Sequence, residues 1–321
     1  RDYYASRGLG DVYKRQTMAI IVNTNITALK TQKNLTNATN SLNSALERMS
    51  TGYKVNRAAD DAAGLYVATG LETQIRGSKV AKANIETGNN VLSTLEGDLD
   101  VILDNLNRIR DLAAQAANSI YDESAMKAMQ DEVTARLAEI DRIAGASNFN
   151  GLKLLDGTSK LANEGLRLQV GANAEAANNS ITIDKSMFAK MDQNTLGANT
   201  TGGDAGTTAI DYSKGLGKNV EAAFAVASAA ARYISIVDTA IDTISTNKAT
   251  IGAVMNRLDA AATSITTTIE NNTAAKSTIM DADIAEESAN YTKAQILQQT
   301  SSALLVQANA LPQIAISLVQ G

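Results

Sequence analysis

A seven-residue apolar repeat runs through much of this chain and constrains its fold more than any other feature. In four stretches, apolar residues recur at alternating three- and four-residue steps, which places them in one narrow seam along a helix. A helix over 219–272 would be about 80 Å long at 1.5 Å per residue, so the repeat predicts a rod of paired helices. The seams are carried by Leu35, Ala38, Leu42, Ala45 and Met49; by Leu92, Leu95, Leu99, Ile102, Leu106, Ile109, Ala113, Ala116 and Ile120; by Ile234, Val237, Ile241, Ile244, Lys248, Ile251, Met255, Leu258, Ala262, Ile265 and Ile269; and by Leu297, Leu304, Leu311 and Leu318, with Ser301, Ala308 and Ala315 on the same side.

The residue types that are missing agree with long helices and argue against catalysis. The chain has one proline, Pro312, and no histidine or cysteine, whereas an average chain carries about 5 % proline. Catalytic Ser-His-Asp and Cys-His sets, zinc fingers and disulfides are therefore excluded. The adjacent carboxylates Asp60–Asp61 and Glu286–Glu287 do not face each other on a helix, so we expect them on a solvated face. No enzyme activity, metal or cofactor is predicted.

Charge and hydropathy limit the partners. The formal net charge is −5, and a chain that binds duplex nucleic acid needs a basic face to displace counterions. No apolar run approaches the roughly 18 residues of a membrane-spanning helix, and no secretory signal peptide is recognisable. We therefore expect neither nucleic-acid binding nor membrane insertion.

The middle of the chain changes character. Asn148-Phe149-Asn150-Gly151 is a turn signal in which glycine supplies a positive φ. Leu166–Val170 alternates apolar and polar residues as a half-buried strand does, and Ile181–Ile183 resembles a returning strand. The chain from Gln193 to Gly217 is rich in Gly, Thr and Asn, which indicates an exposed loop. The predicted fold is mainly α: a long antiparallel helical rod or coiled-coil bundle with a small β-hairpin region in the middle.

Four segments follow from these patterns. Residues 1–17 carry no apolar stripe and precede Met18, so we interpret them as an appended or mistranslated leader; a genuine disordered extension is the alternative. Residues 18–60 with 284–321 form a predicted terminal coiled coil, and 61–184 with 219–283 a helical core with the β-hairpin. Residues 185–218 are predicted to be a short variable surface insertion.

The terminal seams contain many small residues, so the terminal helices bury little apolar area. One such helix does not offset a backbone entropy cost of about 1–2 kcal/mol per residue. We therefore expect the two terminal helices to be marginal in an isolated chain and to become ordered against other copies. An ordinary helical hairpin within a monomer is the alternative, and it is the favoured one for the central helices.

Several motifs resemble those of bacterial flagellins. The similarity covers most of 18–184 and 219–321 and leaves the leader and about 185–218 unmatched. The matching stretches are the one that opens at Met18-Ala-Ile-Ile-Val-Asn, Leu46-Glu47-Arg48-Met49-Ser50-Thr51-Gly52, Asp60-Asp61-Ala62-Ala63-Gly64-Leu65, Leu106-Asn107-Arg108-Ile109-Arg110-Asp111-Leu112, Phe149-Asn150-Gly151, Leu168-Gln169-Val170-Gly171-Ala172-Asn173, and Ala294-Gln295-Ile296-Leu297-Gln298-Gln299.

The resemblance implies a structural subunit that assembles with its own copies into the flagellar filament, outside the cell, after export in an unfolded state. It implies contacts with an export chaperone within about 259–321 and with filament cap and junction proteins. It also implies that the monomer is a ligand of a host Toll-like receptor, through Arg108, Leu112 and Glu132. The expected assembly residues are Leu35, Leu42, Met49, Leu297, Leu304, Leu311 and Leu318.

Two other interpretations remain open at this point. A hook–filament junction protein resembles flagellin at both ends of its chain. A cytoplasmic signalling coiled coil shares the heptad pattern, although it would require a hairpin tip without a β segment. The Gln-Ile-Leu-Gln-Gln and Leu-Gln-Val-Gly-Ala-Asn stretches favour the flagellin family.

Overall fold

The computed structural model describes residues 24–196 and 215–320. The leader expected at 1–17 and most of the expected insertion lie outside these residues. The chain divides into two compact units: a terminal unit, Arg1–Thr69 with Lys276–Gly321, and a central unit, Gly70–Ala275. The predicted mainly α fold with a small β region is confirmed in the described part of the chain.

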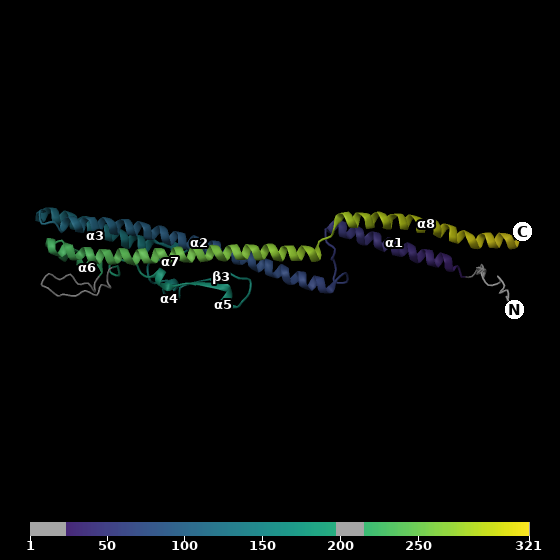
Figure 1. Cartoon of the computed structure of the whole chain (residues 1–321), viewed down its shortest axis with the longest axis horizontal. Helices are drawn as coiled ribbons and strands as arrows, with labels where there is room; N and C mark the ends of the chain where they lie inside the picture. The colour runs from purple at the N-terminus through teal and green to yellow at the C-terminus, as the bar shows by residue number, and fades with distance from the viewer. Residues whose placement is uncertain (1–23, 197–214, 321) are drawn as a thin grey trace, which may run out of the picture. The chain divides into compact units, whose positions relative to one another are not determined.

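The terminal unit is built on two antiparallel helices, α1 (Ile26–Thr51) and α8 (Ile284–Gln320), which lie side by side (Figure 1). The Asn25 side chain accepts a hydrogen bond from the Ala28 amide and so caps the first turn of α1. Gly52 ends α1 with a φ of 74°, and its amide donates to the Arg48 carbonyl. A residue without Cβ suits this left-handed C-cap.

Small residues fill the seam between α1 and α8. Ala38 and Ala45 of α1 are buried, as are Ala294, Ser301 and Ala308 of α8. Side chains this small allow the backbones to approach closely, and Cα atoms of α1 and α8 lie within 8 Å of one another along the pair. Hydrogen bonds fix the register: Gln298 donates to Thr39, and Asn25 donates to the Ala308 carbonyl at 2.7 Å.

The central unit packs two long helices in antiparallel register, α2 (Ala62–Ala116) and α7 (Ala227–Met280). Side-chain hydrogen bonds or ion pairs cross between them along the pair: Gln74 with Asn272, Asn89 with Asp259, Asp100 with Lys248, and Arg110 with Asp238. As one partner's residue number rises the other's falls by nearly the same amount, which is the pattern of an antiparallel pair. The predicted seams of both helices line the core between them, because their apolar members are buried or pack against it, except Ile120; Lys248 pairs with Asp100 instead.

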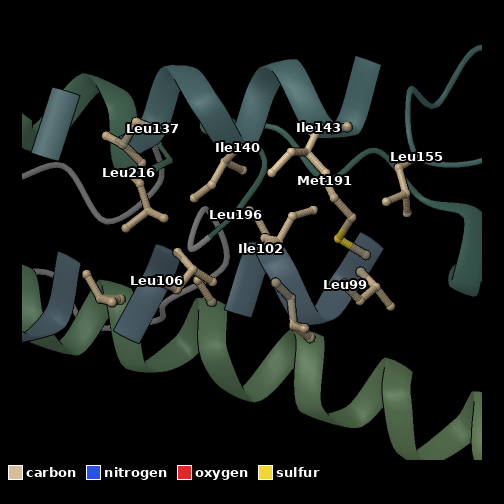
Figure 2. Packing of buried hydrophobic residues seen from close by; sticks show 14 of the residues in the cluster. Leu99, Ile102, Leu106, Leu137, Ile140, Ile143, Leu155, Met191, Leu196 and Leu216 are labelled. Carbon is tan, nitrogen blue, oxygen red and sulfur yellow. The ribbon is translucent and has the colours of Figure 1, made fainter. Parts of the chain in front are cut away.

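A third helix, α3 (Glu123–Ala146), packs along α2, and Asp122 caps its first turn by accepting from the Ala125 amide. Figure 2 shows Leu137, Ile140 and Ile143 of α3 pointing toward Leu99, Ile102 and Leu106 of α2. All of these side chains are buried, and Ile102, Leu106 and Ile140 are fully enclosed. The core therefore lies where three helices meet.

Two small antiparallel sheets follow α3. Strands β1 (Asn148–Phe149) and β2 (Leu152–Lys153) are joined by Asn150 and Gly151, whose φ values are 49° and 81°. Two successive positive φ angles are the requirement of a type I′ hairpin turn. Strands β3 (Leu166–Gln169) and β4 (Ser180–Ile183) form the second sheet, which confirms the predicted hairpin. The short helices α4 (Lys160–Glu164) and α5 (Ala176–Asn179) accompany it.

The prediction of an exposed surface insertion over 185–218 is wrong for residues 185–196, which contribute side chains to the core. Met187 and Phe188, in the 3-10 helix η1 (Lys185–Phe188), are buried in the core of the central unit, and so are Met191 and Leu196 (Figure 2). Polar ties anchor the segment, since the Asp141 carboxylate accepts from both the backbone and the side chain of Gln193. These four apolar residues were not predicted to be buried, because the chain that follows Gln193 is mostly polar.

Two further expectations are corrected. Ile120, placed in the seam by its spacing, lies beyond the end of α2 and is 76 % exposed. The helix expected across 219–272 is interrupted, because α6 (Leu216–Ala223) ends at Phe224 and α7 begins at Ala227. Tyr233 lies buried against Phe224 in an edge-to-face contact and donates to the Leu216 carbonyl, which stabilises this break.

Substitutions of two glycines in α2 can test how closely the β region approaches that helix. A Cβ on Gly77 would lie 2.8 Å from the Ala172 Cβ, whereas a Cβ on Gly97 would meet nothing within 4 Å. We expect Gly97→Ala to raise the free energy of unfolding by about 1 kcal/mol, because alanine is the better helix former. Gly77→Ala should lower it, since the chain near Ala172 must move. Urea unfolding followed by circular dichroism measures both, and an equal gain from the two variants would contradict the packing.

Candidate interaction surface

The terminal unit exposes an unusual number of large apolar side chains. Leu297 is 48 % exposed and Leu304 is 55 % exposed on α8, although the small residues of the same helix are buried. We call seven of them, all on α1 or α8, the terminal apolar surface: Ile26, Leu29, Leu46, Ile296, Leu297, Leu304 and Val306. Exposed apolar side chains gathered on one helix pair are typical of a site of association.

An open groove between α1 and α8 adjoins this surface. Its volume is about 630 Å³, and it is lined by Leu35, Thr39, Gln298, Gln299, Ser302, Ala303 and Val306. The lining is partly apolar and partly amide or hydroxyl. It could receive side chains from another helix, and it offers no charged group for acid–base chemistry.

The expected assembly residues divide into two groups. Leu35, Leu42 and Met49 are half-buried on α1, whereas Leu297 and Leu304 on α8 are about half exposed. These leucines share one side of the helix with Ser301 and Ala308, as their three- and four-residue steps require, but only the small residues are buried. The side chains of Leu311 and Leu318 lie outside the described residues.

A partly buried ion pair at the end of the seam was not predicted from the sequence. Glu287 is only 7 % exposed, and its Oε1 lies 3.1 Å from Arg48 Nη1. The expectation of a solvated Glu286–Glu287 pair is therefore wrong for Glu287. The sequence did contain a signal for this burial, since residues 287, 294, 301 and 308 are spaced seven apart and so lie on one side of the helix. Because an unpaired buried carboxylate is strongly destabilising, this pair favours a single register of α1 against α8.

The three expected receptor residues are not presented together. Arg108 and Glu132 are partly exposed and form a forked ion pair, with Nε 2.9 Å from Oε1. Each partner stabilises the charge of the other, which lowers the pKa of Glu132. Leu112 is 2 % exposed and belongs to the core, so its expected role as an accessible apolar anchor is wrong.

The loop between α1 and α2 is organised by Asp60. Its Oδ2 accepts hydrogen bonds from the backbone amides of Arg57 at 2.9 Å and Asn56 at 3.1 Å. These two bonds, in that order, lower the pKa of Asp60 below its ordinary value. Arg57 also pairs with Glu47 of α1, so the loop is tied back to the helix that precedes it.

This loop should therefore loosen in acid. A carboxylate whose pKa is depressed by folding contributes order above its unfolded pKa of about 3.9 and loses it as pH falls through the lower folded value. We expect the amide resonances of Asn56 and Arg57 to shift together with a midpoint below that of an unfolded aspartate. NMR titration measures this, and Asp60→Asn should abolish the shared transition. Amide shifts that titrate at the ordinary aspartate pKa would contradict the hydrogen-bond assignment.

Two kinds of feature are absent from the described parts of the chain. No cluster of three or more acidic, histidine or cysteine side chains is arranged to hold a metal ion there. None of the described helices combines the length and apolar character needed to cross a bilayer.

The sequence matches two regions of one protein family. Residues 22–160 match the bacterial flagellin N-terminal helical region, and residues 234–319 match the bacterial flagellin C-terminal helical region. The flagellin of Bacillus subtilis (strain 168) is 36 % identical over 311 residues, covering 93 % of this chain and 99 % of that protein. The flagellar filament 33 kDa core protein of Treponema phagedenis is 36 % identical over 312 residues, covering 94 % and 100 % respectively.

A solved structure supports the fold. A Vibrio parahaemolyticus protein described as flagellar hook-associated superimposes with a TM-score of 0.53 at 16 % identity, covering 68 % of this chain and 99 % of that one. At this identity the likeness concerns the fold alone. The two matched regions and the relatives of equal length establish more: the chain belongs to the bacterial flagellin family, whose members are structural subunits of the flagellar filament and not enzymes.

Proposed function

We propose that this chain assembles with copies of itself into the flagellar filament, and that the terminal apolar surface forms the contact between subunits. The observation that carries this proposal is the inverted burial on α8, where Ala294, Ser301 and Ala308 are enclosed while Leu297 and Leu304 are exposed. Burying a leucine side chain contributes about 1.5–3 kcal/mol. A helix pair that keeps alanine inside and leucine outside gains most by associating with further helices.

The chemistry of this surface fits a second copy of the chain. In the described part of α8 the positions near Leu297 and Leu304 are mostly Gln, Ser and Thr, with Lys293 as a charged neighbour of Leu297. The polar side chains disfavour contact with lipid, and the small number of charges disfavours a strongly charged partner. Helices with the same mixture of apolar and uncharged polar side chains are complementary to this surface.

Deletion of residues 284–321 tests the role of these helices. The truncated chain should retain the helical central unit, whose core does not include α8, but it should not polymerise onto filament seeds. Full-length protein prepared in parallel is the control. Normal filaments from the truncated chain would contradict the proposal.

We also propose that the chain leaves the cell unfolded through the flagellar export channel and is accompanied by a chaperone bound within about 259–321. The absence of cysteine and the single proline support this route, because neither crosslinks nor slow prolyl isomers delay refolding. Its further partners would be the cap and junction proteins of the filament. Hydrogen exchange in the free monomer should be fast over 284–320, and strong protection there without a partner would contradict the chaperone proposal.

A host-facing role is a second proposal, centred on the Arg108–Glu132 pair. The monomer, and not the intact filament, would present this partly exposed pair to a Toll-like receptor. Arg108 offers forked, charge-assisted hydrogen bonds, and Glu132 orients it from α3. Because Leu112 is enclosed, the apolar part of such a contact must come from other side chains.

Arg108→Ala measures the contribution of this pair. We expect receptor activation by the monomer to weaken by at least ~10-fold, about 1.4 kcal/mol. The matched control is Arg142→Ala, because Arg142 also makes a forked pair, with Glu139 of the same helix α3. Equal potency of wild type and Arg108→Ala in a reporter-cell assay would contradict the site without affecting the filament proposal.

A further inference from the structure

The turn between β1 and β2 holds a reactive pair of residues. Asn150 is followed by Gly151, and no other asparagine in the 321 residues is followed by glycine. Both residues have positive φ angles, 49° and 81°, so the pair forms the whole of the two-residue turn. The turn chemistry that makes the hairpin also brings a side-chain amide next to an unhindered backbone nitrogen.

Nothing in the described structure protects this pair. Asn150 and Gly151 are exposed, and the Asn150 side-chain amide has no hydrogen-bond partner among the described residues. A Cβ built on Gly151 would meet nothing within 4 Å. The amide carbon is therefore open both to the neighbouring nitrogen and to water.

We propose that Asn150 is a site of spontaneous deamidation. The backbone nitrogen of Gly151 attacks the Asn150 Cγ, forming a C–N bond, while the bond from Cγ to Nδ2 breaks. Ammonia leaves with the proton lost by the Gly151 nitrogen, and a five-membered succinimide remains. Water then opens this ring at one of its two carbonyls, which gives aspartate or isoaspartate at position 150.

The other candidate asparagines are hindered or held. Where serine follows asparagine, its Cβ crowds the attacking nitrogen. Asn40 and Asn43 lie within α1, where the following amides are committed to the helix, and Asn179 donates its side-chain amide to the Glu175 carbonyl. Asn118 is exposed and precedes Ser119 beyond the end of α2, so it is the appropriate internal comparison.

The two products would affect the hairpin differently. Aspartate adds one negative charge and is tolerated at positive φ, so the turn persists. Isoaspartate inserts an extra carbon into the backbone of a two-residue turn, which no longer fits the pairing of Phe149 with Leu152. Because the fully buried Leu154 and Leu155 follow β2 directly, this distortion would reach the core of the central unit.

Peptide mapping by mass spectrometry of the folded full-length monomer, aged at mildly alkaline pH, tests the proposal. Asn150 should convert at least ~10-fold faster than Asn118, equivalent to about 1.4 kcal/mol in activation free energy. It should yield both acidic products, with Asn150→Asp as the chromatographic standard for one of them. Circular dichroism verifies that the aged chain is still folded. Conversion of Asn150 no faster than Asn118, or an intact amide at both, would overturn the proposal; no filament is needed, so the outcome is independent of the proposed function.

Discussion

Leu304→Asp should prevent polymerisation while leaving the monomer folded. Leu304 is more than half exposed, so an aspartate there is solvated in the free chain and should not change its helix content. Between subunits the same carboxylate would be desolvated without a partner, which costs several kcal/mol. We expect the critical concentration for seeded polymerisation to rise at least ~100-fold, about 2.7 kcal/mol.

The matched control is Gln295→Asp. It introduces the same charge on the same helix at an exposed position that is already polar. Its critical concentration should stay within about threefold of wild type, the range of an ordinary surface substitution. Sedimentation of seeded samples measures both variants. If Leu304→Asp polymerised like wild type, the terminal apolar surface would not be part of the assembly contact. If Gln295→Asp failed to polymerise as well, any added charge on α8 would be sufficient to prevent assembly.

Leu99→Ala should strongly destabilise the central unit. Leu99 is fully enclosed where α2 meets α3 and α7, as Figure 2 shows in part. Its truncation leaves a cavity in a close-packed core, and such changes cost about 2–5 kcal/mol. Val101, two residues along the same helix, is half exposed, so Val101→Ala is the control and should change stability by less than about 0.5 kcal/mol.

Hydrogen exchange can assign the Leu99→Ala effect to a part of the molecule. For amides of the central unit, the free energy of exchange should fall by as much as the free energy of unfolding. For amides of α1 it should change little, because α1 pairs with α8 and not with this core. Equal loss of protection in α1 would show that the two units unfold together.

The sequence predicted the long helices well because their apolar period is long and uninterrupted. Series such as Leu92–Ala116 leave only one face for burial, and the structure buries that face. The Asn150–Gly151 turn and the β3–β4 hairpin were also predicted, since glycine chemistry and strict alternation are local signals. These features depend on neighbouring residues alone.

The errors arose where the outcome depends on a partner segment. On α8, the leucine series and the small-residue series lie on one side of the helix, and how deeply each is buried depends on how closely the backbones approach. Alanine and serine are buried against α1 because the two backbones approach closely, and Leu297 and Leu304 stay about half exposed. Glu287 was misplaced for the same reason, because its burial requires Arg48, 239 positions away along the chain.

The core residues between 185 and 196 were missed because polar composition outweighed a short apolar series. Met187, Phe188 and Met191 have no helical or strand period long enough to detect, and their burial depends on contacts with other segments of the central unit, such as those between η1 and α4. Leu112 was misread differently: one turn from Arg108 on α2, it was taken to share that residue's exposed face, but its side chain is enclosed.

Cryo-electron microscopy of the purified full-length protein after seeding tests the central proposal most directly. We predict long helical filaments in which α1 and α8 of neighbouring subunits are in contact and Leu297 and Leu304 are buried between subunits. Isolated rods or dimers, or filaments in which Leu297 and Leu304 remain exposed to solvent, would contradict it.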